Sequence, residues 1–355
     1  MADNSSTNRT ALVVGATGVV GWTLLHRLTA SAGWRTIGLS RNEPANVPAD
    51  GFVAVDLLDR AKLDAQRQQF ASVSHVFLTT RLPGGTPAEE ADANLAALTN
   101  LLDVLEPVAA DLRHVCLVHG TKWYGSHLGP YRLPARETDP RHMSPNFYHS
   151  QYDVIASRQR GKTWTFSTLR PHTVWGHNGG TGNSLVTAIG VYAAISRALD
   201  LPLRFPGPPA SYAKISQGVT ATLLAEAMEW VATTPTCTGE SFNITNGDVF
   251  RWQDLWPRIA DFFGMEVGPV QQIPLAEMMA DKAAVWDGVV RKHGLRPAAM
   301  AQLVSWSYLD GLLAATWDDI SSTIKARRFG FSAAVDSEQA FLQVLGELRR
   351  MRILP

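Results

Sequence analysis

Three glycines follow the first apolar run of this 355-residue sequence and constrain its fold more than any other feature. The aliphatic run Ala11–Val14 ends at Gly15, and apolar residues resume with helical spacing from Trp22. Gly15, Gly18 and Gly21 therefore occupy a strand–turn–helix unit, in which glycine permits a tight turn and brings backbone N–H groups close to a pyrophosphate. The unit predicts a dinucleotide-binding α/β fold, with glycines that serve only the turn as the alternative.

Short apolar runs recur along the first half of the chain and alternate with segments of helical spacing. The runs are Thr36–Leu39, Phe52–Val55, Val76–Leu78, Val115–Val118 and Trp164–Leu169. Continuous hydrophobicity of this kind is typical of strands that are buried on both faces of a parallel sheet. The clearest helical segment is Asn94–Leu105, in which leucines recur at three- and four-residue steps. The alternation predicts a doubly wound, Rossmann-type parallel sheet.

The second half of the chain departs from this alternation, with clustered prolines and recurrent tryptophans. The length also exceeds the roughly 250–300 residues at which single cores stop growing, which favours a second lobe. We expect residues 1–175 to form a dinucleotide-binding domain to which 211–246 returns, with Ser241–Thr245 as a strand. Residues 176–210 and 247–355 are expected to form a smaller, mostly helical substrate-binding lobe.

The charge balance argues for a small-molecule partner. The 32 basic and 32 acidic residues cancel, so neither nucleic acid nor an anionic membrane surface is favoured. The most apolar stretch, Leu185–Ile195, is shorter than the ~20 residues that a bilayer crossing requires. The polar segment Met1–Thr10 lacks the features of a secretory signal, and Cys116 and Cys237 read as buried thiols. We therefore expect a cytoplasmic protein, with a homodimer as the default assembly.

A basic residue follows the second predicted strand, where an NAD-dependent enzyme usually carries an acid for the ribose hydroxyls. The sequence there is Ser40-Arg41-Asn42. Because a guanidinium chelates phosphate through paired N–H donors, Arg41 favours NADP(H) over NAD(H). A solvated surface arginine is the alternative. Asp56, after the third predicted strand, is interpreted as an acceptor for the adenine amino group or as a helix cap.

A catalytic tyrosine–lysine pair with the usual short-chain dehydrogenase spacing is missing around Tyr148. The fourth residue after Tyr148 is Tyr152 rather than lysine. Lys122 is the candidate, since it lies in the segment His119–Tyr124, just past the predicted strand at Val115–Val118, at the sheet edge where doubly wound folds bind ligands. A solvated loop lysine is the alternative interpretation.

The segments Gly120–Tyr124 and Asn146–Asp153 make the sequence resemble the progesterone 5β-reductase and iridoid synthase family of atypical, extended short-chain dehydrogenases. That family carries a Gly-x-Lys-x-Tyr stretch and an Asn-Phe-Tyr-Tyr-x-x-Glu-Asp motif. Further matching blocks are Arg170-Pro171, Val191–Ile195, Phe242–Phe250 and Gly294-Leu295, so the resemblance spans nearly the whole chain. It implies that Lys122 and Tyr148 are the catalytic pair. His149 and Tyr152 depart from the second Tyr and the Glu of the motif.

By position, the resemblance also implies a set of cofactor contacts. Together with the turn glycines, these are Thr17, Gly18, Val19, Arg41, Asp56, Leu57, Thr80, Val118, Tyr148 and Val174. Four aromatic residues were further candidates for an apolar substrate pocket or for plain core packing, namely Trp123, Trp175, Phe205 and Tyr212. His172 and His177 lack metal-ligand spacing and receive no site role, so no metal is expected.

The function implied is NADPH-dependent reduction of the C=C bond of an α,β-unsaturated carbonyl. In that hypothesis Tyr148 stabilises the enolate, and the ammonium of Lys122 lowers the pKa of the phenol. An NADP-dependent carbonyl reductase, alcohol dehydrogenase or sugar-nucleotide-type epimerase is the first alternative. A non-catalytic NADP(H) sensor is the second, because a fold does not by itself establish a function.

Overall fold

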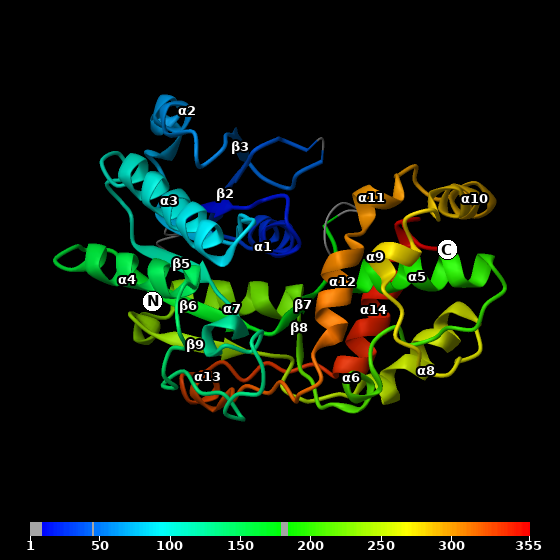
Figure 1. Cartoon of the computed structure of the whole chain (residues 1–355). Coiled ribbons are helices and arrows are strands. Elements are labelled where there is room, and N and C mark those ends of the chain that lie inside the picture. Colours follow the sequence, from blue (N-terminus) through cyan, green and yellow to red (C-terminus); the bar gives the residue numbers. More distant parts are fainter. Residues whose placement is uncertain (1–8, 45, 179–183) are drawn as a thin grey trace, which may run out of the picture.

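A seven-stranded, all-parallel sheet forms the centre of the computed structural model, which describes residues 9–44, 46–178 and 184–355. Most of the segment Met1–Thr10, on which the prediction about a secretory signal rests, lies outside the described residues. The strand order is β3-β2-β1-β4-β5-β6-β9, as expected for a doubly wound fold (Figure 1). The strands are β1 (Arg9–Val14), β2 (Trp34–Ser40), β3 (Gly51–Ala54), β4 (His75–Leu78), β5 (His114–Val118), β6 (Thr165–Pro171) and β9 (Ser241–Ile244).

Both faces of the sheet are buried, which confirms the interpretation of the continuous apolar runs. Leu12 and Val14 of β1 pack into one core, whereas Ala11 and Val13 point into the other. The first core is completed by α2 (Arg60–Ala65), α3 (Pro87–Leu105) and α4 (Phe147–Gln159). The second is completed by α1 (Val19–Ala30), α7 (Ala221–Thr233) and α13 (Ile324–Arg328).

Local capping explains where the helices beside the sheet begin. Thr86 caps α3 by accepting a hydrogen bond from Glu89 N, and the Glu89 carboxylate accepts one from Thr86 N in return. Thr220 caps α7, and Asn146 caps α4 by accepting from the backbone N–H of Tyr148 at 2.9 Å. The cap at Asn146 therefore fixes the residue at which the helix carrying Tyr148 starts.

The second lobe is helical and has its own apolar core, beside the sheet in Figure 1. Its helices are α5 (Leu185–Ala198), α6 (Pro209–Ala213), α8 (Trp252–Phe263), α9 (Leu275–Met278), α10 (Ala283–His293), α11 (Met300–Leu303), α12 (Trp306–Ala314) and α14 (Ser337–Arg350). Between the lobes, β7 (Thr173–Trp175) pairs with β8 (Gly218–Thr220) in a two-stranded parallel sheet that the sequence did not predict. Three short 3-10 helices complete the described elements: η1 (Arg67–Phe70), η2 (Thr121–Tyr124) and η3 (Pro235–Cys237).

Several residues that were candidates for a substrate pocket instead pack into cores. Trp175 and Phe205 are fully buried in the core of the helical lobe, and Tyr212 packs against that core. Their size and apolar surface are used for packing between helices. Cys116 and Cys237 are buried free thiols, as expected. Within the described ranges, none of the helices is long and apolar enough to cross a membrane.

Candidate active site at the carboxyl edge of the sheet

The turn after β1 and the helix that follows it each require a glycine. Gly15 has φ +87°, and a Cβ there would lie 2.9 Å from the backbone nitrogen of Thr80. A Cβ on Gly21, inside α1, would lie 2.3 Å from the carbonyl oxygen of Gly15. The helix and the turn thus pack backbone to backbone. Gly18 caps α1 without a side chain, so the helix N-terminus is open toward any group bound above the turn.

A pocket of about 480 Å³ opens beside this turn at the carboxyl ends of β1 to β4. Seven of the residues predicted to contact the cofactor line it: Gly15, Thr17, Gly18, Arg41, Asp56, Leu57 and Thr80. Val19 and Gly21 belong to α1 behind the turn, and Val118 and Val174 are half-buried at the end of β5 and on β7. The lining also includes Arg81, which was not among the predicted cofactor contacts.

Arg41 and Asp56 take different positions on the rim of this pocket. Arg41 is exposed in the turn after β2, where the Ser40 hydroxyl donates to the carbonyl of Asn42 at 2.8 Å. Asp56 accepts a hydrogen bond from the backbone N–H of Leu58 at 2.9 Å, which holds its carboxylate in the loop after β3. Asp56 does not cap a helix, because Asp59 is the cap of α2.

Lys122 and Tyr148 come from two elements that are tied together by hydrogen bonds. Lys122 lies in η2, directly after β5, and Tyr148 lies in the first turn of α4. The side-chain amide of Asn146 donates to the carbonyl oxygen of Lys122 at 2.8 Å, and His142 Nε2 lies 2.9 Å from the same oxygen. The segment containing Lys122 is therefore fixed to the N-terminus of the helix that carries Tyr148.

The hydroxyl of Tyr148 reaches back over the bend between β5 and η2. A Cβ on Gly120 would lie 3.1 Å from this hydroxyl oxygen, so glycine makes room for it. Gly120 has extended backbone, and the close approach rather than a left-handed φ favours glycine here. Tyr148 is 9 % exposed, and no described residue forms a hydrogen bond with its hydroxyl. The hydroxyl therefore has its donor capacity available within the described part of the chain.

The pKa of the phenol behaves differently from the expectation. Burial raises the pKa of Tyr148 to about 12, and the charge of Glu90 also raises it. Arg81, rather than Lys122, is the cation that opposes this shift. Burial is also the main reason that the pKa of Lys122 lies below its usual value, and Arg81 lowers it further. The expected lowering of the phenol pKa by Lys122 is therefore wrong, because the cost of burying the phenolate outweighs the cationic charge nearby.

The two departures from the family motif lie behind the active-site face, around the buried ring of Trp123. His149 donates from Nε2 to the carbonyl of Trp123 at 3.1 Å. Its ring also packs edge-on against the Trp123 ring, with 4.8 Å between the ring centres. Tyr152 packs edge-on against the same ring at 5.6 Å. The guanidinium of Arg170 lies 3.7 Å from the centre of that ring. Trp123 is thus enclosed by these side chains, and the two departures form a support for η2.

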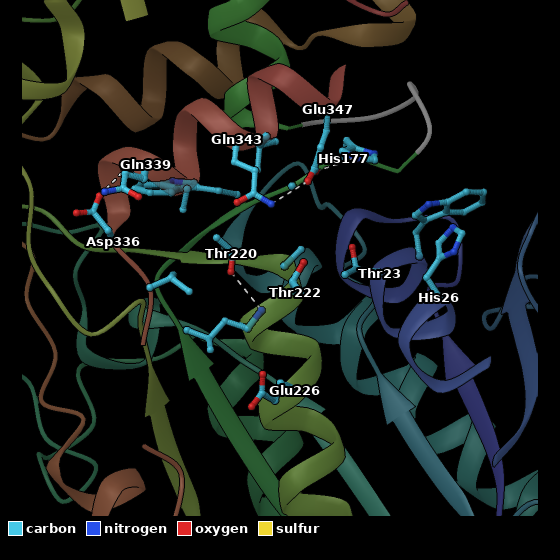
Figure 2. Close-up of a pocket in the computed structure, with 18 residues that line it drawn as sticks. Thr23, His26, His177, Thr220, Thr222, Glu226, Asp336, Gln339, Gln343 and Glu347 are labelled. Carbon is cyan, nitrogen blue, oxygen red and sulfur yellow. Dashed lines mark hydrogen bonds and ion pairs between the residues drawn. The ribbon is translucent and has the colours of Figure 1, made fainter. Parts of the chain in front are cut away.

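A second pocket, of about 620 Å³, lies between α1, the start of α7 and α14, and Lys122 and Tyr148 do not line it. Figure 2 shows Thr23 and His26 on one side, Thr220 and Thr222 below, and Gln343 above. His177 forms an ion pair with Glu347 at 3.3 Å at this pocket.

The two histidines without a predicted site role lie in different surroundings. His177 lines the second pocket, whereas His172 is buried and forms a hydrogen bond with Ser321 at 2.8 Å. The part of the chain that the structure describes contains no cluster of three or more His, Cys, Asp or Glu residues suited to a metal.

Comparison with known proteins agrees with this architecture. A family model described as a PRISE-like Rossmann-fold domain matches residues 44–355. The (S)-8-oxocitronellyl enol synthase of Nepeta cataria is 32% identical over 97% of this chain and 91% of that protein. The 3-oxo-Delta(4,5)-steroid 5-beta-reductase of Arabidopsis thaliana is 30% identical over 97% of this chain and 93% of that protein.

Solved structures show the same fold at lower sequence identity. The UDP-glucose 4-epimerase of Thermotoga maritima superimposes with a TM-score of 0.69 at 16% identity, covering 96% of this chain and 99% of that one. RMD from Pseudomonas aeruginosa, solved with NADPH, has a TM-score of 0.67 at 14% identity, covering 97% and 100%. The sequence matches confirm the resemblance drawn from Gly120–Tyr124 and Asn146–Asp153, and the chain belongs to the PRISE-like Rossmann-fold family, together with the steroid 5β-reductase and the oxocitronellyl enol synthases.

Proposed function

We propose that this protein is an NADP(H)-dependent reductase that adds hydride to the C=C bond of an α,β-unsaturated carbonyl compound. The observation that carries the proposal is the position of the Tyr148 hydroxyl over the bend after β5, on an element that is tied to Lys122. Both lie at the carboxyl edge of the sheet, where the dinucleotide turn also lies. The relatives named as a steroid 5β-reductase and as oxocitronellyl enol synthases support this reaction class.

The residues of the smaller pocket fit a dinucleotide. Glycine at position 15 keeps the turn tight against Thr80, and the N-terminus of α1, capped without a side chain, is left open for a pyrophosphate. Arg41 lines the pocket after β2, where an acid would favour the free ribose hydroxyls of NAD(H). A guanidinium there supports NADP(H), because it pairs with a 2′-phosphate that an acid would repel.

Tyr148 acts as the donor to the substrate oxygen. A nicotinamide held in this pocket would supply hydride, and addition of hydride to the β-carbon of the substrate would build negative charge on the substrate's carbonyl oxygen. A phenol with a pKa of about 12 stays protonated at neutral pH and donates a hydrogen bond to that oxygen. The burial of Tyr148 limits competition from water, which makes the hydrogen bond more effective as the enolate forms.

We assign to Lys122 the role of supplying positive charge toward the substrate oxygen. Among the described residues its ammonium has no hydrogen bond and no ion pair. Its backbone is held through its carbonyl by Asn146, so the start of the side chain is fixed while the ammonium remains available. Solvent can then return a proton to the α-carbon of the enolate.

Isotope placement tests this function against the nearest alternative. The protein would be incubated with an enone and NADPH deuterated at the transferring position of C4, and the product analysed by mass spectrometry and NMR. The proposal expects a saturated ketone or aldehyde with deuterium at the β-carbon. Deuterium on a carbinol carbon would instead identify a carbonyl reductase in which Tyr148 protonates the carbonyl oxygen. NADPH binding without any NADPH consumption across an enone and ketone panel would favour a sensor.

A further inference from the structure

Arg81 is the third residue of the loop after β4 and lines the smaller pocket together with Gly15 and Gly18. Its backbone position is fixed from α3. The amide of Asn94 accepts a hydrogen bond from Leu82 N at 2.9 Å and donates to Leu82 O at 2.6 Å. Asn94 itself is 1 % exposed, so this contact is made inside the protein. The loop therefore presents Arg81 from a rigid support.

The side chain of Arg81 is also oriented by a partner. Its Nε donates to a carboxylate oxygen of Glu90 in the first turn of α3. The Glu90 side chain is 17% exposed and that of Arg81 is 48% exposed, so the carboxylate lies on the inner side of the pair. Among the described residues, neither Nη of Arg81 takes part in a hydrogen bond. The pair thus fixes the guanidinium while leaving its two terminal nitrogens open.

The exit of β4 directly adjoins the glycine turn. The backbone nitrogen of Thr80 is 2.9 Å from the position of a Cβ on Gly15, and the Thr79 hydroxyl donates to Val14 O at 2.7 Å. Arg81 is the next residue, with a side chain long enough to reach a group lying over the turn. Its charge also affects the pKa values of Lys122 and Tyr148, as expected for a cation between the cofactor pocket and the catalytic pair.

We infer that Arg81, oriented by Glu90, binds the diphosphate of the dinucleotide with its two terminal guanidinium nitrogens. The inference rests on the proposed nicotinamide cofactor, though not on the proposed reaction. Two parallel N–H donors suit the spacing of phosphate oxygens, and a guanidinium retains its charge at any physiological pH. An anionic group on the substrate would have the same chemistry. The diphosphate is favoured because Arg81 lines the pocket that contains the glycine turn.

Binding measurements with cofactor fragments separate this role from that of Arg41. Isothermal titration calorimetry would compare NADPH, NADH and 2′-AMP on the wild type, Arg81→Gln and Arg41→Gln. For Arg81→Gln we expect roughly tenfold weaker binding of both NADPH and NADH, with 2′-AMP unaffected because it has no diphosphate. For Arg41→Gln we expect weaker binding of NADPH and 2′-AMP and unchanged binding of NADH.

A matched control and a double variant complete the test. Arg67 of η1 has a side chain that is 46% exposed, close to the 48% of Arg81, and it forms an ion pair with Asp64 of α2 and does not line the pocket. Arg67→Gln should leave all three affinities unchanged. If Glu90 acts only by orienting Arg81, Glu90→Ala should weaken NADPH binding in the wild type and have no further effect in Arg81→Gln.

Other outcomes would overturn the inference. One is an NADPH affinity of Arg81→Gln equal to that of the wild type. Another is an affinity of Arg81→Gln that is reduced for NADPH but not for NADH. A third is an unchanged cofactor affinity together with a raised KM only for carboxylate-bearing enones. A wild type that binds neither dinucleotide would overturn the proposed cofactor as well. If the wild type binds NADPH and Arg81→Gln binds it equally tightly, this inference fails while the proposed cofactor stands.

Discussion

The side-chain amide of Asn146 donates a hydrogen bond to the carbonyl oxygen of Lys122 at 2.8 Å, and so joins the two elements that carry the proposed catalytic pair. The same side chain caps α4 by accepting from Tyr148 N at 2.9 Å. One residue therefore sets both the start of the helix below Tyr148 and the position of η2. In the usual short-chain dehydrogenase arrangement the tyrosine and the lysine lie on one helix. Here Tyr148 lies on α4 and Lys122 on η2, and Asn146 links the two elements.

The two roles of Asn146 are separable by substitution. Asn146→Asp keeps an oxygen that caps α4 but removes the N–H donor to Lys122, so the lysine segment should shift while the helix stays intact. We expect kcat to fall by roughly one to two orders of magnitude with little change in Tm. Asn146→Ala should also cost about 1 kcal/mol of stability through the lost cap. Steady-state kinetics and thermal unfolding of both variants check this, and equal kcat in Asn146→Asp and wild type would remove the positioning role.

The backbone contact at Gly21 predicts a cofactor-binding defect. A Cβ at this position would lie 2.3 Å from Gly15 O, so Gly21→Ala must displace the turn from α1. We expect NADPH affinity to fall at least tenfold, measured by calorimetry. Gly288 in α10 is the matched control, since a Cβ there meets nothing within 4 Å. Gly288→Ala should stabilise the protein by about 0.5–1 kcal/mol without altering NADPH binding. Similar affinities in both variants would contradict the account of the turn.

The pKa directions at the active site predict the alkaline limb of the pH–rate profile. Tyr148, with a pKa of about 12, remains protonated over the measurable range. The pKa of Lys122 lies below its ordinary value of 10.5 because of burial, so its positive charge is lost first as the pH rises. We expect kcat/KM to fall at high pH in the wild type, and this fall to disappear in Lys122→Arg, whose guanidinium does not titrate there. The same alkaline limb in both proteins would assign it to another group.

Two buried histidines predict acid sensitivity of the fold. Burial lowers the pKa of His75 to about 4 and that of His114 to about 3, so both are neutral in the folded protein. Their contribution to stability is fully present above the unfolded-state pKa of about 6.5 and is lost as the pH falls from there toward the folded values. The free energy of unfolding should drop by up to about 1.4 kcal/mol per pH unit for each histidine in that window.

A substitution at His114 checks this assignment. Its ring nitrogens lie 2.8 Å from Thr165 Oγ1 and 2.9 Å from Ser167 Oγ, contacts that glutamine can partly replace without titrating. His114→Gln should therefore make the unfolding free energy, measured by urea titration between pH 6.5 and 4.5, less steeply dependent on pH. An unaltered slope would contradict the role of His114.

The sequence predicted most of the sheet because its strands are buried on both faces and read as uninterrupted apolar runs. The pair β7–β8 escaped prediction, since three-residue strands such as Thr173–Trp175 carry no periodic pattern. Residue type alone could not decide between a core and a pocket position for Trp175 and Phe205, because large aromatic side chains occur in both. Arg81 was missed for lack of a motif. A charged residue at the end of β4 was the available signal, but its pairing with Glu90 depends on how the loop folds back onto α3.

The family motif predicts Lys122 and Tyr148 as the catalytic pair, but it does not predict the charges around them. Burial and the Arg81–Glu90 pair determine the direction of both pKa shifts, and these depend on side chains that the fold brings together. The same limit applied to His149 and Tyr152. Only their contacts with Trp123 show that they support η2.

The most direct test of the account is the rate of enone reduction by Tyr148→Phe under saturating NADPH. This variant keeps the ring packing and removes only the donor hydroxyl. The account predicts that kcat falls on the order of 10²–10³-fold while the NADPH dissociation constant, measured by calorimetry, stays within about twofold of wild type. Turnover at the wild-type rate would contradict the assignment of Tyr148 as the group that holds the developing enolate.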